Sequence, residues 1–157
     1  MIDPQQPDKS GSANSAAATA LRVDHWGMLR EHASMVRHEV FVLEQQVPPE
    51  LEMDEMDAQC IHVVAYDAQQ RPIATGRLLP DGHIGRMAVR KIARGTGIGG
   101  LVLQRLIEAA RARGDAEVVL SAQVHAMGFY ARYGFVAEGE VYMDAGIAHR
   151  TMSLPLV

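Results

Sequence analysis

The glycine-rich turn between Arg94 and Gly100 constrains the fold of this chain more than any other stretch. It reads RGTGIGG and follows a short apolar segment, HIGRMAV, at residues 83–89. Apolar residues then recur at helical spacing until Gly114, and they are Leu101, Val102, Leu103, Leu106, Ile107 and Ala110. This order predicts a strand, a turn and an amphipathic helix that Gly114 ends.

Glycines at the start of a helix let the unpaired N–H groups of the first turn approach an anion, which the helix dipole also favours. The turn therefore predicts a site for a phosphate or pyrophosphate. It is not a P-loop, because Leu101 and Val102 follow Gly100 where that motif has Lys and then Ser or Thr.

A dinucleotide-binding fingerprint is formally present as Gly95-Thr96-Gly97-Ile98-Gly99-Gly100, with Glu117 about 20 residues onward where a ribose-binding acid is expected. Two features argue against it. The fingerprint should follow its strand directly, whereas RKIAR intervenes, and residues 101–157 are too few for the second half of a Rossmann sheet. A nucleotide-binding oxidoreductase is therefore only a third hypothesis.

The size and composition of the chain are those of one globular domain. It has 157 residues, of which 48% are hydrophobic and 22% are charged. We expect a disordered segment over residues 1–20, which are rich in Ser, Ala, Gln and Pro, and a single domain over residues 21–157.

Charge and cysteine content exclude several classes of partner. A net charge of −4 argues against nucleic acid as the main ligand, and no stretch approaches the roughly 18 consecutive apolar residues of a membrane span. A single cysteine, Cys60, excludes an internal disulfide. With no apolar leader, we expect a cytoplasmic protein in which Cys60 is buried rather than reactive.

The segments before the turn predict strands and helices together. A first strand near residues 21–23 is followed by helical spacing over residues 24–46, which predicts one or two helices ending near Gln46. Five acids then lie close together, and they are Glu50, Glu52, Asp54, Glu55 and Asp57. A solvated surface loop is the simpler interpretation of these acids, and a site for a cationic amine is the alternative.

Three short apolar segments predict an antiparallel meander, at residues 61–66, 73–79 and 83–89. Strict alternation in the third puts His83, Gly85, Met87 and Val89 on one face. Residues 117–122 predict a buried strand parallel to residues 83–89, because strand-helix-strand units close in parallel. A short helix at residues 125–133 and a hairpin of residues 135–143 and 150–154 complete an α+β fold.

Several motifs together resemble one known family. Arg94-Gly95-Thr96-Gly97-Ile98-Gly99 resembles the (Gln/Arg)-x-x-Gly-x-(Gly/Ala) loop with which GNAT acetyltransferases hold the pyrophosphate of acetyl-CoA. HIGRMAV is similar to the fourth strand of that family, LSAQ at residues 120–123 to the end of the fifth, and AMGFYARYGF at residues 126–135 to its A-x-x-F-Y-x-x-x-G-F helix. The resemblance covers residues 72–154.

A narrower resemblance concerns one branch of the family. RHEVFVLEQ at residues 37–45, the stretch onward through Asp57 and His62, and AGIAH at residues 145–149 are similar to ElaA-like proteins. The fold implied is a mixed, mostly antiparallel sheet with splayed central parallel strands, flanked by helices.

The function implied is an acetyl-CoA-dependent N-acetyltransferase. Acetyl-CoA would be the co-substrate, and a primary amine of a small molecule or peptide would attack it directly in a ternary complex, without a metal. A homodimer is a further expectation from the family. The alternative is a non-catalytic acyl-CoA-binding or regulatory module.

The resemblance also implies the residues that contact acetyl-CoA. They are Met87, Ala88, Val89, Arg94, Gly95, Thr96, Gly97, Ile98, Gly99, Gly100, Gln123 and Phe129. A backbone N–H near Met87 or Val89 would stabilise the oxyanion, and Tyr130 would protonate the departing thiolate unless it merely packs. Tyr133 is expected to be structural.

The base that takes the proton of the amine is open. Glu44 and His83 are the candidates, each against a structural or surface role, and a water relay is a third route. Histidines 62, 125 and 149 are weaker candidates, and their spacing predicts no metal site. Three arginines, Arg37, Arg77 and Arg86, would contact a substrate carboxylate or the CoA phosphates, or else be structural.

Overall fold

The computed structural model describes residues 20–157, so the disorder expected over residues 1–20 lies outside the described residues except at Ala20, where the first strand begins. The strands form one seven-stranded sheet in the order β1-β2-β3-β4-β5-β7-β6. Their bounds are β1 (Ala20–His25), β2 (Ile61–Tyr66), β3 (Pro72–Leu78), β4 (His83–Val89), β5 (Glu117–Gln123), β6 (Val136–Asp144) and β7 (Ile147–Pro155).

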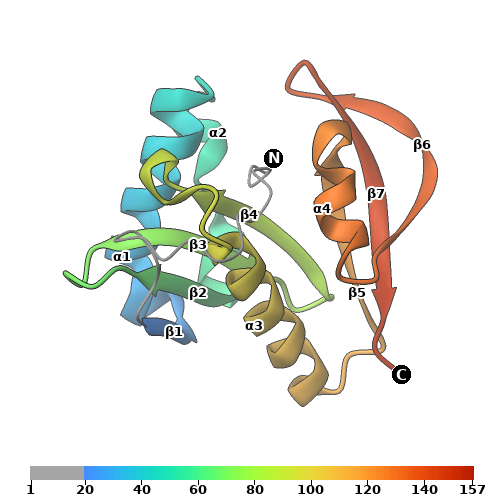
Figure 1. The fold of residues 1–157 in the computed structure, drawn as a ribbon, viewed down its shortest axis with the longest axis horizontal. Coiled ribbons are helices and arrows are strands. Elements are labelled where there is room, and N and C mark those ends of the chain that lie inside the picture. The colour runs from blue at the N-terminus through green and yellow to red at the C-terminus, as the bar shows by residue number, and fades with distance from the viewer. Residues whose placement is uncertain (1–19) are drawn as a thin grey trace.

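Helices cover both faces of this sheet (Figure 1). Their bounds are α1 (Trp26–Arg37), α2 (Pro49–Glu52), α3 (Ile98–Arg113) and α4 (Met127–Ala131), with a π-helix at His38–Glu44 and 3-10 turns at Glu55–Gln59, Lys91–Ala93 and Val124–Ala126. In β2, alternate residues pack in opposite directions: Val63 lies in the core beneath α3, and Val64 contacts the side of α1 that carries Leu29. The α+β class is confirmed, and no helix of the described chain is long and apolar enough to cross a membrane.

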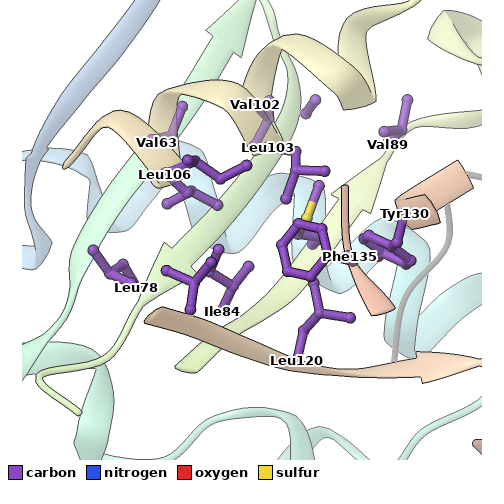
Figure 2. Close-up of a cluster of buried hydrophobic side chains, with 14 of the residues drawn as sticks. Val63, Leu78, Ile84, Val89, Val102, Leu103, Leu106, Leu120, Tyr130 and Phe135 are labelled. Atoms are coloured by element: carbon purple, nitrogen blue, oxygen red, sulfur yellow. The ribbon is translucent and has the colours of Figure 1, made fainter. Parts of the chain in front are cut away.

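The core beneath α3 ties the two halves of the sheet together. Leu103 and Leu106 of α3 pack over the strands, and Leu120 of β5 joins the same cluster (Figure 2). Tyr130 and Phe135 close it near Val89, the last residue of β4. The end of β4 and helix α4 therefore share one packed core.

The central parallel strands diverge, as expected from the family resemblance. β4 and β5 pair only at His83↔Val119 and Ile84↔Leu120, whereas β5 pairs with β7 along its whole length. Beyond Ile84 the two strands separate towards their C-terminal ends (Figure 1). The meander, the parallel pair and the final hairpin are confirmed.

A bulge in β4 overturns the strict alternation expected there. Opposite Gly76 of β3 the strand carries two residues, Arg86 and Met87, and Arg86 has a φ of 50°. The extra residue reverses the alternation, so that Met87 and Val89 join Ile84 in the core while the side chain of His83 is 53% exposed. The prediction that His83 and Met87 share a face is wrong for this reason.

The acidic stretch is not a solvated loop, and this prediction is wrong for two of its five acids. Glu52 is 4% exposed and Asp57 is 2% exposed. Arg37, itself 1% exposed, donates to both carboxylates, and Arg77 donates to Asp57 and Asp54. A buried ion network therefore holds α2 and the 3-10 turn after it against the sheet.

All three arginines named in the sequence analysis take part in this network. Arg77 and Arg37 are structural, because their donors are directed at buried carboxylates. Arg86 donates from Nε to the carbonyl oxygen of Glu52 at 3.1 Å and from Nη2 to Asp54 at 3.2 Å. These bonds hold the left-handed backbone at Arg86, a conformation that costs about 1–3 kcal/mol in a non-glycine residue.

Acid should weaken this network by protonating Asp54. The hydrogen bonds from Arg77 are the main cause that lowers the pKa of Asp54 to about 2. A carboxyl whose pKa is lowered on folding adds stability above its unfolded pKa, near 4, and that stability disappears as the pH falls towards the folded pKa. We expect Asp54→Asn to have a lower melting temperature than wild type above pH 4, and the difference to narrow between about pH 4 and 2.

Thermal melts of both proteins across this pH range measure the effect. A difference in melting temperature that stays constant from pH 6 to 3 would show that Asp54 has no lowered pKa.

Candidate active site

The turn after β4 has the geometry of an anion site. Gly95 and Gly97 have φ values of 81° and 83°, in the left-handed region that favours glycine, and Thr96 Oγ1 donates to the carbonyl oxygen of Ala93 at 2.6 Å. Gly97 precedes the 16-residue helix α3. Within the described chain no side chain caps this helix and its first turn holds no acid. Its first N–H groups are therefore available to an external acceptor.

A pocket of about 260 Å³ lies at this turn. Eight of the residues expected to contact acetyl-CoA line it, and they are Val89, Arg94, Gly95, Gly97, Ile98, Gly99, Gly100 and Phe129. Small side chains, free backbone donors and nearby arginines fit a pyrophosphate. The structure thus brings together the end of β4, the turn, the start of α3 and the first turns of α4.

Tyr133 explains why glycine stands at position 100. A Cβ atom at Gly100 would lie 1.9 Å from Tyr133 Oη, so any larger residue would displace this ring. The ring of Tyr133 also packs 5.4 Å from that of Phe129, centroid to centroid. Tyr133 therefore docks the region after α4 onto α3, in agreement with the structural role expected for it.

Arg132 is a pocket residue that the sequence reasoning missed. It lines the pocket, and its guanidinium lies 5.7 Å from the centroid of the Phe129 ring. The motif A-x-x-F-Y-x-x-x-G-F treats this position as variable, which is why the match did not single it out. The available signal was a basic residue one helical turn from Phe129, on the same helix face.

Glu44 lies beside the turn but in an ion pair. Arg94 donates to both of its carboxylate oxygens, at 2.6 and 2.7 Å, and Arg94 Nε donates to the carbonyl oxygen of Val89 at 3.0 Å. The hydrogen bond from Arg94 is the main cause that lowers the pKa of Glu44. A carboxylate held in this way is a weaker base, so its geometry favours orienting Arg94.

His83 lies at the opposite end of β4 from the pocket. It lies six positions along the strand from Val89, which corresponds to about 20 Å. Its Nδ1 is 3.1 Å from an oxygen of Asp81, and it occupies the end where β4 and β5 are still paired. The structure does not bring His83 to the opening between the C-terminal halves of β4 and β5.

The remaining candidates lie around the opening. Tyr130 is fully buried, with its ring centroid 5.0 Å from that of Phe129 and 6.0 Å from that of Phe135. Met87 is buried beneath α3, whereas Ala88 faces the other side of the sheet and packs against Phe41. Gln123, the last residue of β5, is 3% exposed.

Cys60 is 2% exposed, so the expectation that it is buried is confirmed. Burial raises the pKa of its thiol to about 11, which makes it a poor nucleophile at neutral pH. Among residues 20–157, no three His, Cys, Asp or Glu side chains are grouped so as to hold a metal ion.

Comparison with known proteins agrees with this geometry. The family model described as an acetyltransferase (GNAT) domain matches residues 28–156. The uncharacterized N-acetyltransferase YjcF of Bacillus subtilis (strain 168) is 40% identical over 124 residues, which are 76% of this chain and 88% of that protein.

Two solved structures are also similar. An acyl-CoA N-acyltransferase from Pseudomonas aeruginosa is 34% identical, with a TM-score of 0.75 over 85% of this chain and 97% of that one. Escherichia coli ElaA is 26% identical, with a TM-score of 0.76 over the same shares of 85% and 97%. The divergent central strands and the glycine turn thus coincide with a match over most of the domain, and the chain belongs to the GNAT family of N-acetyltransferases.

Proposed function

We propose that this acyltransferase moves an acetyl group from acetyl-CoA to a primary amine by direct attack in a ternary complex. The observation that carries the proposal is that the start of α3 lies close to the end of β4. The glycine-lined start of α3, which no side chain caps, follows β4 after the 3-10 turn Lys91–Ala93, and Val89 at the end of β4, where β4 has separated from β5, lines the same pocket. The candidate anion site and an unpaired strand edge would therefore adjoin each other.

The turn would hold the pyrophosphate of acetyl-CoA. Backbone N–H groups of the first turn of α3 would donate to it, and the guanidinium of Arg132, which lines the same pocket, would offset part of its charge. Bound acetyl-CoA would supply the thioester that the amine attacks and the thiolate that leaves.

The free edge of β4 would stabilise the oxyanion. The N–H of Arg90 donates to Ile73 of β3 at 2.9 Å, and successive N–H groups of a strand point to opposite edges. The N–H groups of Val89 and Met87 therefore face away from β3, towards the opening. A donor of this kind contributes about 2.7–4 kcal/mol in other enzymes.

Tyr130 would protonate the thiolate as it leaves. We expect Tyr130→Phe to lower kcat about 100-fold while the Kd of acetyl-CoA stays nearly unchanged, because the phenol acts only as the C–S bond breaks. Tyr66→Phe is a matched control, since Tyr66 is also buried but its hydroxyl pairs with His32 at 2.7 Å on the far side of the sheet. An unchanged kcat in Tyr130→Phe would exclude the acid role.

The reaction itself is tested by CoA release in the presence of a panel of amines, with the N-acetylated product identified by mass spectrometry. Direct attack requires that the intact mass of the protein stay unchanged after incubation with acetyl-CoA alone. Binding of acetyl-CoA without release for any amine would favour the non-catalytic module instead.

A further inference from the structure

His149 carries a buried nitrogen that is ready to accept a proton. The side chain is 1% exposed, and its Nδ1 lies 2.8 Å from the carbonyl oxygen of Ile147. A carbonyl oxygen only accepts hydrogen bonds, so Nδ1 carries the proton and Nε2 of the neutral ring holds a lone pair. Within the described part of the chain, Nε2 has no hydrogen-bond partner. Buried polar atoms are seldom left without one.

Neighbouring strands surround this nitrogen with polar and aromatic groups. His149 of β7 lies directly opposite Gln123 of β5 and Tyr142 of β6, so the three side chains share one face of the sheet. The amide nitrogen of Gln123 is also buried and lacks a partner among residues 20–157. The ring of Tyr142 stacks on that of His149 with centroids 6.0 Å apart, and its hydroxyl is bonded to Ser121.

Gln123, His149 and Tyr142 lie on the face of the sheet opposite to α3. Leu120 and Ala122 of β5 lie in the core beneath α3, and Gln123, the next residue, points the other way. Tyr130 belongs to the α3 side. Gln123 is also the last residue of β5, where that strand no longer pairs with β4. β7 lies beyond β5 from the opening between β4 and β5, so His149 faces it across Gln123, on the side of the sheet away from the candidate leaving-group acid.

We infer that His149 Nε2 is the general base for the acceptor amine, an inference that rests on the proposed acetyl transfer. The neutral amine forms the N–C bond to the thioester carbon, and His149 takes the proton that the nitrogen loses. The C–S bond breaks and Tyr130 gives a proton to the thiolate sulfur. Proton exchange with solvent restores both residues, so the sum is amine plus acetyl-CoA to amide plus CoA.

His149 Nε2 and the amide nitrogen of Gln123, which both lack a partner among residues 20–157, also indicate which acceptor would fit. His149 Nε2 requires a donor, which an amine N–H supplies, while the amide N–H of Gln123 requires an acceptor. Tyr142 adds an aromatic wall on the same face. The acceptor class is thus a primary amine with an oxygen acceptor, such as a carbonyl or hydroxyl, close to the nitrogen.

The kinetic test compares His149→Gln and His149→Ala with wild type, using the best amine of the panel. We expect kcat/KM for the amine to fall about 100-fold in both variants, an unchanged Kd for acetyl-CoA, and partial recovery of His149→Ala by added imidazole. His25→Gln is a matched control, because His25 is exposed on β1 at the opposite edge of the sheet. Wild-type kcat/KM in His149→Gln, or no recovery by imidazole in folded His149→Ala, would overturn the assignment.

A second measurement does not depend on turnover or on the folding of a variant. Side-chain ¹⁵N NMR of histidine-labelled wild-type protein reports which ring nitrogen of His149 carries the proton. In the neutral ring we expect the proton on Nδ1 and none on Nε2, and the opposite tautomer would overturn the inference. If the NMR result holds and acetyl-CoA binds but no amine reacts, acetyl transfer itself has failed rather than the state of His149.

Discussion

Gly97→Asp is expected to lower the affinity for acetyl-CoA about 100-fold or more, because a carboxylate at the mouth of α3 repels the pyrophosphate at short range. Gly97 immediately precedes α3 and lines the pocket at the turn. A side-chain acceptor there would also bond to the first-turn N–H groups that the phosphates require. The substitution therefore adds a negative charge that repels the pyrophosphate, and it also occupies the first-turn N–H groups that would bind it.

Gly97→Asn is the matched control for this substitution. Asn has nearly the shape of Asp and tolerates the left-handed backbone found at Gly97, where φ is 83°. It lacks the negative charge, so we expect it to weaken binding by less than about tenfold. Calorimetric titration of the three proteins with acetyl-CoA measures the difference, and equal affinities of the Asp and Asn variants would exclude an anion at this turn.

Arg37→Met is expected to lower the free energy of unfolding by about 3–5 kcal/mol, the cost of leaving buried charges without their partner. The guanidinium of Arg37 donates to the carboxylates of Glu52 and Asp57, and it lies 5.3 Å from the ring centroid of Trp26. Met retains much of the side-chain volume. The loss therefore reports the uncompensated carboxylates rather than a cavity.

Arg90→Met is the control for Arg37→Met, because Arg90 pairs with Glu39 at the surface, where the two side chains are 28% and 41% exposed. An exposed pair of this kind contributes about 0–1 kcal/mol. Urea unfolding of the two variants and wild type gives both free energies. A loss below 1 kcal/mol in Arg37→Met would mean that the network adds little to stability, and that α2 is held by its apolar contacts instead.

The parts of the site that lie close together in sequence could be predicted without the structure. The turn from Arg94 to Gly100, the helix that follows it and the Phe129-Tyr130 pair are local patterns, whose glycines and apolar spacing specify backbone geometry directly. Eight residues expected to contact acetyl-CoA line the same pocket for this reason. Their roles in binding and catalysis stay predictions until the variants are measured.

Features that depend on distant residues could not be predicted from these patterns. The acids at 52 and 57 look like surface charges because their arginine partners are 15 to 34 positions away in sequence. His83 begins β4, but only the pairing of β4 with β5 shows that it lies at the closed end of the opening. His149 and Gln123 become neighbours only through the register of β5 and β7.

The sequence alone therefore determined the order of the elements, the glycine-rich turn before α3 and the family, since each depends on residues within one segment. Tertiary structure decided the face on which each side chain lies. Gly76 shows the physical reason: a Cβ atom there would lie 2.8 Å from Leu106 of α3, and opposite this close contact β4 accommodates the extra residue of its bulge. One inserted residue reverses every later side chain of the strand, and only the packing of α3 on β3 and the pairing between strands reveal it.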